Sequence, residues 1–311
     1  MFQPMKIFAV FGNPILHSKS PQLFNSAFEN FKVDAFYTRI RPQSATDIID
    51  IIKKLPLAGA NITAPYKEDA LNLLDEFSID AKAVGAVNTV VNYNGRLIGH
   101  NTDHVGVTES LKNAGINLSR SKCLVLGGGG AARAAVYGLK KSEAEVYICN
   151  RTLSKAQIIA SDFGCKVLDW NNFDSSIDFD VVVSTLLPEA IPPFLQSLKF
   201  YFLLDASYKS SAVSRIASEM NVEIIEGKWW LIHQAVAAYE LFLGVKPSFE
   251  SMASAFDVKL DKEKLRIETF PLSEKYELAT QRVDLIVSTK SLDASVLKNI
   301  VDEEIGKAFG S

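Results

Sequence analysis

The run Gly127-Gly-Gly-Gly130 is the feature of this sequence that most restricts its fold. An apolar stretch at Cys123–Leu126 precedes it, and a helical pattern at about Ala131–Lys141 follows. Glycine permits a sharp turn from strand to helix and lets a ligand approach the backbone closely. The run also begins a G-x-G-x-x-A pattern, in the context where phosphates meet the N–H groups of a helix N-terminus. We therefore predict a nucleotide-binding βα unit, whose phosphate loop consists of Gly127, Gly128, Gly129, Gly130 and Ala131.

Short apolar runs alternate with helical patterns through most of the chain. The expected strands are Lys6–Phe11, Ala35–Ile40, Gly59–Ile62, Val87–Asn92, Arg96–Gly99, Cys123–Leu126, Glu145–Cys149, Val181–Ser184, Phe202–Asp205 and Val222–Ile225. The expected helices include Pro21–Phe31 with Ser20 as its N-cap, Ser44–Lys54, Lys67–Leu74, Ser154–Phe163, Val213–Glu219 and Trp229–Gly244. Strands that alternate with helices imply an α/β fold with parallel sheets covered on both faces. Asn94-Gly95, between two apolar runs, predicts a hairpin.

The order of these elements predicts two domains and a C-terminal extension. We expect residues 1–103 and 231–264 to form the first α/β domain, because the helix at Trp229–Gly244 returns the chain to it. Residues 104–230 would form the second. Residues 265–311 form the extension, with strands at Leu265–Phe270 and Val283–Ser288 and an amphipathic helix at Leu292–Phe309 that starts near Ser291. The sequence leaves open whether this extension docks on the first domain, makes a dimer contact or belongs to a fusion partner.

Composition excludes several classes of function. The chain has 311 residues, with 48% hydrophobic and 22% charged residues and a net charge of −3, so no bulk positive field recruits nucleic acid or an anionic membrane. It contains neither a signal-peptide pattern nor an 18-residue apolar run. Its three cysteines lie in apolar segments without metal-ligand spacing, which is typical of buried, reduced thiols in a cytoplasmic protein. We expect a cytoplasmic monomer or homodimer that binds a small molecule.

We expect no metal site. His100 and His104 have the i, i+4 spacing of helical metal ligands, but no third ligand is evident in the sequence. We expect His104 to be a partly exposed residue at the start of a helix.

The segment after the second strand of the nucleotide domain indicates which dinucleotide binds. A fold specific for NAD usually has Asp or Glu there for the ribose 2′-hydroxyl, whereas arginine suits a 2′-phosphate. Asn150, Arg151, Thr152 and Lys155 offer donors and positive charge without a carboxylate. These residues favour NADP over NAD, although a solvated loop arginine is the alternative interpretation.

Lys67 and Asp103 are the candidate catalytic residues. Reduction of a ketone needs a hydride and a proton for the oxygen, and a lysine oriented by a carboxylate can supply the proton. Burial would favour the neutral amine, whereas Asp103 would favour the ammonium. Taken alone, the pair is better explained as a surface salt bridge.

The surrounding motifs resemble those of the shikimate dehydrogenase family over most of residues 5–250. Six motifs occur in the family's order: Gly12-Asn-Pro-Ile-Leu-His-Ser18-Lys-Ser20-Pro21, Asn61-Ile-Thr63-Ala-Pro65-Tyr-Lys67, Gly85-Ala-Val-Asn88-Thr89 with Asn101-Thr102-Asp103, Gly127–Arg133, Asn150-Arg151-Thr152, and Gln234 in its late helix. The resemblance implies an N-terminal α/β substrate domain and a Rossmann-like, doubly wound NADP domain on either side of a cleft. It also implies reversible, NADP-dependent reduction of 3-dehydroshikimate to shikimate.

The same resemblance assigns roles to single residues. Lys67 would be the acid/base and Asp103 its partner. Substrate binding would fall to Ser18, Ser20 and Tyr208 at the carboxylate, and to Thr63, Asn88 and Gln234 at the hydroxyls. Ser184 would lie near the nicotinamide, in a segment that departs from the family's usual Asn-Ala-Thr.

Two other functions stay open at this point. One is a quinate or quinate/shikimate dehydrogenase that uses NAD, which Ser18, Ser20 and Arg151 argue against. The other is a non-catalytic dinucleotide-binding sensor of the same fold, for which loss of Lys67 or Asp103 would be the sign.

Overall fold

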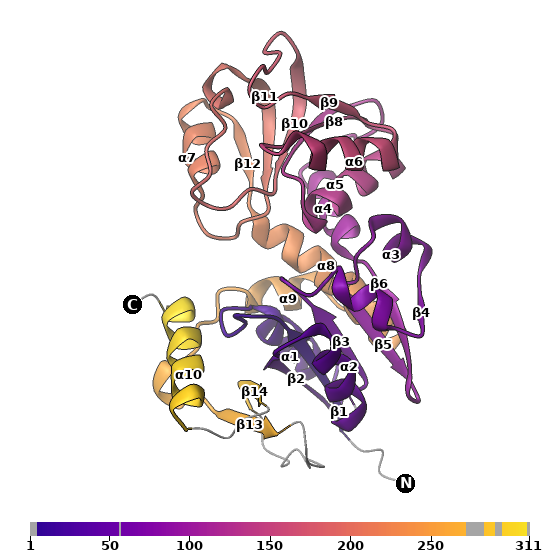
Figure 1. Ribbon diagram of the computed structural model, residues 1–311, viewed down its shortest axis with the longest axis vertical. Coiled ribbons are helices and arrows are strands. Elements are labelled where there is room, and N and C mark those ends of the chain that lie inside the picture. The colour runs from indigo at the N-terminus through magenta and orange to yellow at the C-terminus, as the bar shows by residue number, and fades with distance from the viewer. Residues whose placement is uncertain (1–4, 56, 272–282, 290–293, 310–311) are drawn as a thin grey trace. The chain divides into compact units, whose positions relative to one another are not determined.

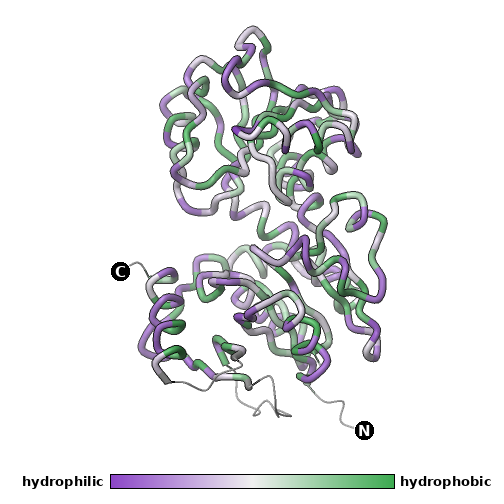
Figure 2. Tube along the Cα trace, in the orientation of Figure 1, coloured by the Kyte–Doolittle hydropathy of each residue, from purple (hydrophilic) through white to green (hydrophobic). Residues whose placement is uncertain are grey.

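The computed structural model describes residues 5–55, 57–271, 283–289 and 294–309. The chain divides into two compact units, one made of Met1–Asn101 with Ala235–Ser311 and the other of Thr102–Gln234. Figure 1 shows a sheet with helices against it in each unit, and Figure 2 shows that the strands carry much of the hydrophobic sequence. The α/β class expected from the sequence is confirmed.

The first unit contains an eight-stranded sheet in the order β13-β14-β2-β1-β3-β5-β6-β4. Its strands are β1 (Lys6–Phe11), β2 (Ala35–Arg41), β3 (Gly59–Ile62), β4 (Glu76–Phe77), β5 (Thr89–Tyr93), β6 (Arg96–His100), β13 (Ile267–Pro271) and β14 (Leu285–Thr289). The run from β13 to β3 is parallel. β5 is antiparallel to both β3 and β6, so this sheet is mixed rather than parallel throughout. The chain reverses between β5 and β6 at the predicted hairpin, where Asn94 and Gly95 have positive φ.

Helices cover both faces of this sheet. They are α1 (Ser20–Asn30), α2 (Ala45–Lys54), α3 (Ile79–Val84), α9 (Phe249–Ala255) and α10 (Ala294–Phe309), with 3₁₀ turns η1 (Asp69–Leu73) and η3 (Lys262–Lys264). One face packs the isoleucines of α2 against β2, β3, β13 and β14. The other is rich in aromatic rings, where Phe24 of α1 stacks on Tyr37 with ring centroids 4.4 Å apart. The long helix α8 (Gly227–Leu243) adds Tyr239 and Phe242 to this second face.

The C-terminal extension is part of the first unit. β14 pairs with β2, with Ile286 opposite Ile40 and Val287 opposite Arg41, and β13 pairs with β14 at the sheet edge. The expected cap Ser291 lies outside the described residues. Within the described chain, the expected extension helix begins at Ala294 and ends at Phe309.

The second unit contains a six-stranded parallel sheet in the order β12-β11-β10-β7-β8-β9. Its elements are β7 (Lys122–Leu126), β8 (Glu145–Cys149), β9 (Lys166–Leu168), β10 (Asp178–Ser184), β11 (Lys199–Asp205), β12 (Glu223–Ile225), α4 (Asp103–Asn113), α5 (Gly130–Lys141), α6 (Leu153–Phe163), α7 (Ala212–Glu219) and η2 (Leu195–Ser197). The strand order reverses between β7 and β10, which is the switch point where doubly wound sheets bind ligands. Residues of each strand alternate between two hydrophobic clusters, one on each face.

Three local expectations were wrong. The helix expected at Lys67–Leu74 is a turn followed by η1, which begins only at Asp69. Ser20 is the first residue of α1 rather than its cap, which is Lys19 and makes no side-chain cap hydrogen bond. His104 is buried at 7% exposure, because its ring packs edge-on against Tyr137 of α5.

Candidate active site

The glycine run joins β7 to α5 and forms an open cradle. Gly127 has φ +129°, a backbone conformation that favours glycine, and a Cβ there would lie 2.1 Å from Thr185 Oγ1. A Cβ on Gly128 would lie 2.9 Å from the Asn150 side chain. Around Gly129, by contrast, no heavy atom beyond the glycine and its neighbours in the chain lies within 4 Å of the Cβ position. Gly127 and Gly128 therefore serve the packing of the turn, whereas Gly129 leaves room for a ligand.

The N-terminus of α5 faces this opening with backbone N–H donors. Gly129 caps the helix without a side-chain hydrogen bond, and the first-turn amides, including those of Gly130 and Ala131, have no acceptor within the helix. Such amides and the positive end of the helix dipole bind phosphate groups. The cradle thus fits the pyrophosphate of a dinucleotide.

The residues after β8 form a positively charged rim. Asn150 Nδ2 donates to the Thr152 carbonyl at 2.9 Å, which shapes the turn into α6. Arg151, Thr152 and Lys155 are exposed at this turn, and Asn150 is half-buried. Exposed cations with no acid among them suit a 2′-phosphate.

Ser184 is the last residue of β10, on the other side of the switch point, and Thr185 follows it. Ser184 is 1% exposed, and its carbonyl accepts from Ala206 N at 2.8 Å. Thr185 is half-buried, and its N–H and its hydroxyl both donate to the Leu126 carbonyl at 2.9 Å. Thr185, which the motifs did not single out, is therefore the residue that lies against the glycine turn. Its only signal in the sequence is its place after a buried strand.

In the first unit, the loops after β1 and β3 lie together, because these strands are parallel neighbours and their carboxyl ends share one edge. Asn13 N donates to the Ala64 carbonyl at 3.2 Å, and Thr63 N donates to the Phe11 carbonyl at 2.8 Å. The Asn13–Pro14 and Ala64–Pro65 peptide bonds in these loops are both cis. The structure thereby brings the serine motif and the lysine motif into one place.

Ser18 and Ser20 lie in the first loop, which we call the serine loop (residues 12–20). Ser18 Oγ donates to Ser20 Oγ at 3.3 Å, and Ser20 N donates to Ser18 Oγ at 3.3 Å. Arg39 of β2, 1% exposed, donates from Nε and Nη2 to the Ser18 carbonyl at 3.0 and 2.7 Å. A guanidinium so close to paired hydroxyls favours an anion at this loop. The sequence signal for Arg39 is that it is an arginine within an apolar strand.

Lys19 adds to the positive charge of the serine loop. Its Nζ donates to the Val258 carbonyl at 2.9 Å. Burial, and next the charge of Arg39, lower the pKa of Lys19, while Asp257 partly offsets this shift. The local field around Ser18 and Ser20 is therefore one that attracts a carboxylate.

Thr63 and Lys67 come from the second loop, and both are half-buried. The Lys67 carbonyl accepts from Val87 N at 2.8 Å, which ties the lysine turn to the segment that carries Asn88. Asn88 is 3% exposed, and its Oδ1 accepts from Thr89 Oγ1 at 2.9 Å.

Asn61 connects the two segments. Its Nδ2 donates to the Asn88 carbonyl at 3.0 Å and to Thr89 Oγ1 at 2.9 Å, while its Oδ1 accepts from Tyr37 Oη at 2.6 Å. This network, together with the bond from Val87 N to the Lys67 carbonyl, ties the Asn88 segment to the lysine turn within the first unit. Its hub, Asn61, opens the lysine motif, but its position in the motif gave no sign of this role.

Asp103, Tyr208 and Gln234 belong to the second unit. Asp103 is the first residue of α4 and is 3% exposed. Gln234 is half-buried on α8. The structure therefore groups the predicted residues by unit, with Ser18, Ser20, Thr63, Lys67 and Asn88 in the first.

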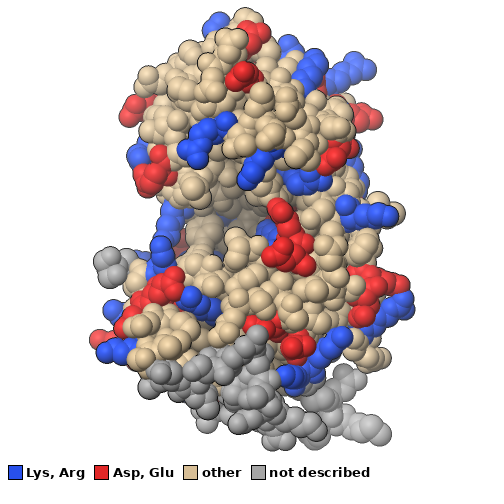
Figure 3. All heavy atoms as spheres, viewed as in Figure 1, with Lys and Arg blue, Asp and Glu red and all other residues tan. Residues whose placement is uncertain are grey.

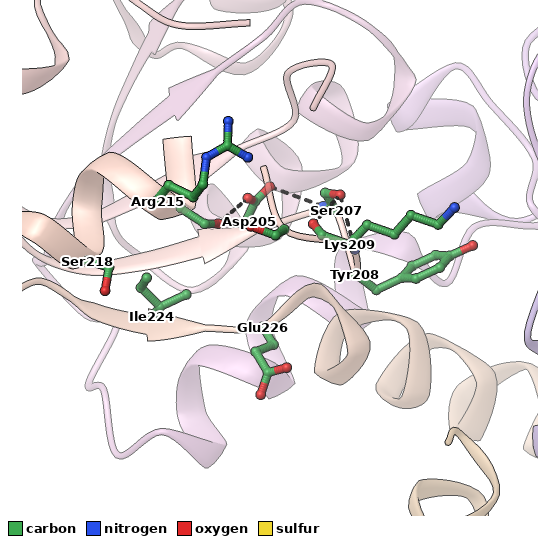
Figure 4. Close-up of a pocket in the computed structure, with 10 residues that line it drawn as sticks. Asp205, Ser207, Tyr208, Lys209, Arg215, Ser218, Ile224 and Glu226 are labelled. Carbon is green, nitrogen blue, oxygen red and sulfur yellow. Dashed lines mark hydrogen bonds between the residues drawn. The ribbon is translucent and has the colours of Figure 1, made fainter. Parts of the chain in front are cut away.

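Tyr208 lines a cavity of about 360 Å³ beside β11 and α7 (Figure 4). Asp205, 1% exposed, anchors the loop here by accepting from Ser207 N at 3.1 Å and from the hydroxyls of Ser211 and Ser214. In Figure 4 the side chains of Tyr208 and Lys209 extend in the same direction, away from Asp205. The loop after β11 thus carries Tyr208 at the wall of this cavity.

The surface charges in Figure 3 are mixed in sign, and the described residues do not form a metal-binding cluster. Both signs are interspersed on the face seen in Figure 3. Among the described residues, no cluster of three or more His, Cys, Asp or Glu could hold a metal ion, and no helix is long and apolar enough to span a bilayer. His100 ends β6 and His104 lies on α4, so their spacing is not that of two ligands on one helix.

Known proteins match both units. Residues 10–90 match the family described as the shikimate dehydrogenase substrate binding domain, and residues 109–191 match the family described as shikimate / quinate 5-dehydrogenase. A shikimate dehydrogenase (NADP(+)) from Pyrococcus abyssi is 32% identical, with 80% of this chain and 96% of the relative covered. One from Nitrosopumilus maritimus is 35% identical, with 80% and 97% covered.

Solved structures give the same result. Shikimate 5-dehydrogenase from Thermus thermophilus, in complex with NADP(H) and shikimate, is 31% identical with a TM-score of 0.75, and the match covers 81% of this chain and 98% of that one. Shikimate dehydrogenase from Aquifex aeolicus is 29% identical with a TM-score of 0.77, covering 83% and 100%. By sequence and by structure, this chain belongs to the shikimate dehydrogenase family.

Proposed function

We propose that the chain catalyses the reversible, NADPH-dependent reduction of 3-dehydroshikimate to shikimate, a step of aromatic amino-acid (chorismate) biosynthesis. The observation that carries this proposal is the first unit's polar site. There, paired serines tied to a buried arginine lie in the loop that contacts the lysine loop, and Asn61 of the lysine motif bonds to Asn88 and Thr89. That combination suits a small molecule with one carboxylate, several hydroxyls and a carbonyl to be reduced. The relatives named above are dehydrogenases of this kind.

The carboxylate of the substrate binds at the serine loop. Ser18 and Ser20 donate their hydroxyls to it, and the charge of Arg39 offsets the loss of water around it. Tyr208 gives a further hydroxyl. Thr63, Asn88 and Gln234 bind the ring hydroxyls. Because a missing hydroxyl would leave buried groups unpaired, such a site rejects analogues strongly.

Lys67 and Asp103 handle the proton. Bound NADPH supplies the hydride that reduces the ketone. The Lys67 ammonium gives the proton that the new hydroxyl needs, and in the oxidation direction the Lys67 amine takes it back. Asp103 orients the lysine and accepts a hydrogen bond from a substrate hydroxyl. Retention of both residues supports an enzyme over a non-catalytic sensor.

Arg151 supports NADP over NAD as the cofactor. It lies exposed beside Asn150, Thr152 and Lys155, where a 2′-phosphate would bind, while the amides at Gly129–Ala131 hold the pyrophosphate. NAD lacks the 2′-phosphate and would not need this cationic rim.

Initial rates of the purified protein test the proposal. We expect turnover with shikimate and NADP that exceeds turnover with quinate and NAD by orders of magnitude in kcat/KM. A preference for quinate and NAD would replace the proposal with the quinate alternative. Absence of turnover with either pair would show that the protein is not this enzyme.

We also propose that the protein is a cytoplasmic monomer or homodimer. Its three cysteines all lie in the described chain and are free thiols. Burial raises the pKa of Cys123 and of Cys149 to about 12. Buried, protonated thiols fit a reducing compartment.

A further inference from the structure

Glu304 is a charged residue in an unexpected place. It lies on α10 of the C-terminal extension and is 0% exposed. Its Oε2 accepts from Ile15 N at 2.8 Å and from Leu16 N at 2.7 Å, and its Oε1 lies 3.1 Å from Ile15 N. A side chain far along the sequence thus holds two consecutive amides of the serine loop.

Arg41 balances the charge of this carboxylate. Its Nη1 donates to Glu304 Oε1 at 3.0 Å, and its Nη2 donates to the exposed neighbour Glu303 at 2.7 Å. Removing one partner of a buried, hydrogen-bonded ion pair costs folding free energy, because it leaves the other charge buried without compensation. The contact between Glu304 and the serine loop is therefore a firm one.

Two further contacts join the extension to β2. Thr38 Oγ1 donates to the Val283 carbonyl at 2.6 Å, and Arg39 Nη1 donates to the Asp284 carbonyl at 3.3 Å. The same Arg39 side chain donates to the Ser18 carbonyl from its other nitrogens. The extension consequently reaches the serine loop from two sides, through Glu304 and through Arg39.

These contacts act close to the two serines. Ile15 and Leu16 are 0% exposed. The Ile15 carbonyl accepts from Ser18 N at 2.9 Å, and Ser18 Oγ meets Ser20 Oγ at 3.3 Å. Fixing the Ile15 amide thus fixes the turn from which both hydroxyls project.

We propose that the described part of the C-terminal extension (residues 265–271, 283–289 and 294–309) completes the substrate site, with Glu304 as a positioning residue that holds the serine loop in the conformation that binds the substrate carboxylate. This inference rests on the proposed function, in which Ser18 and Ser20 bind that carboxylate. The two curated relatives match over nearly their whole lengths but cover only 80% of this chain, so about a fifth of this chain lies outside those matches.

The test compares three variants of the full chain. Glu304→Gln keeps the size of the side chain but removes its charge and one acceptor. Glu304→Asp keeps the charge and withdraws the oxygens by one methylene. Glu303→Gln is the matched control, because Glu303 is exposed and pairs with the outer nitrogen of Arg41.

Amide hydrogen exchange measures the protection of the serine-loop amides directly and does not require enzymatic activity. In the wild type, Ile15 and Leu16 should exchange slowly. In Glu304→Gln their protection should fall about tenfold or more, as expected when a charge-assisted hydrogen bond is lost, whereas Glu303→Gln should match the wild type. Fast exchange of both amides in the wild type, or unchanged protection in Glu304→Gln, would overturn the inference.

Kinetics then separate positioning from simple destabilisation. Glu304→Gln should raise KM for shikimate about tenfold, with kcat and the KM for NADP within about twofold of wild type. Its preference for shikimate over the methyl ester of shikimate should shrink by a similar factor. If Glu304→Gln only destabilised the enzyme, the amount of active protein would fall, and the rates with shikimate and with its methyl ester would fall by the same factor. An unchanged preference for shikimate over the ester would therefore contradict the inference.

Two safeguards keep the outcomes distinct. If Glu304→Gln does not fold, Glu304→Asp takes its place and should show the same changes at smaller size. If the wild type turns over neither shikimate nor its ester, the proposed function fails, while exchange at Ile15 and Leu16 still decides whether Glu304 positions the loop.

Discussion

Gly129→Ala and Gly127→Ala should separate a glycine kept for the ligand from a glycine kept for the fold. Gly129 has φ −103°, which any residue adopts, and its Cβ position is open. An alanine there should change the free energy of unfolding by no more than about 1 kcal/mol. It should nevertheless place a methyl group where the pyrophosphate approaches the backbone.

The expected loss of NADP affinity follows from the hydrogen bonds displaced. A charge-assisted hydrogen bond contributes about 1.5–3 kcal/mol. Loss of one such bond should raise the Kd for NADP about 10- to 100-fold, with KM for shikimate unchanged. Isothermal titration with NADP+ measures the first effect and initial rates measure the second.

Gly127→Ala is the matched variant in which the fold itself should suffer. With φ +129° and a Cβ 2.1 Å from Thr185 Oγ1, the alanine should cost about 1–3 kcal/mol. At about 2–4 °C per kcal/mol, a cost near 2 kcal/mol lowers Tm by roughly 4–8 °C. NADP binding as tight as wild type in Gly129→Ala would refute the phosphate loop, and an unchanged Tm in Gly127→Ala would refute the packing argument.

Three further predictions concern single residues. Lys67→Ala should lower kcat by more than about a hundredfold in steady-state assays, because it removes the proton-transfer group; a rise in KM alone would mean that Lys67 only binds substrate. Arg151→Ala should raise KM for NADP about 10- to 100-fold without affecting NAD, and an equal effect on both would place the 2′-phosphate elsewhere. Burial lowers the pKa of His100 below its usual 6.5, against a smaller opposing effect of Asp80. As the pH drops below 6.5, His100 therefore takes up its proton in the unfolded chain at a higher pH than in the folded chain, so the free energy of unfolding should fall. Urea unfolding should show a flatter dependence of stability on pH in His100→Asn than in the wild type.

Much of the fold could be predicted because its signals are local. The alternation of strands and helices, and the glycine turn before α5, follow from short-range patterns, and the Asn94-Gly95 turn has the positive φ values that its sequence predicts. The lysine turn was missed because tertiary loop contacts, such as that of the Lys67 carbonyl with Val87 N, shape it rather than helix propensity.

Burial set by distant elements could not be predicted. His104 is buried because α5 packs closely on α4, where a Cβ on Gly138 would lie 2.8 Å from the His104 carbonyl. Glu304 reads as an exposed residue of an amphipathic helix, and only the tertiary structure places it under Ile15 and Leu16. Arg39 carried a weak signal, since an arginine in an apolar strand calls for polar partners.

A crystal structure of the protein with shikimate and NADP+ would show directly whether the proposed residues bind the substrate and the cofactor. We predict the substrate carboxylate within hydrogen-bond distance of Ser18 and Ser20, the reacting hydroxyl at Lys67 and Asp103, and the 2′-phosphate at Arg151. A carboxylate bound away from the two serines, or a reacting hydroxyl out of reach of Lys67, would contradict this prediction.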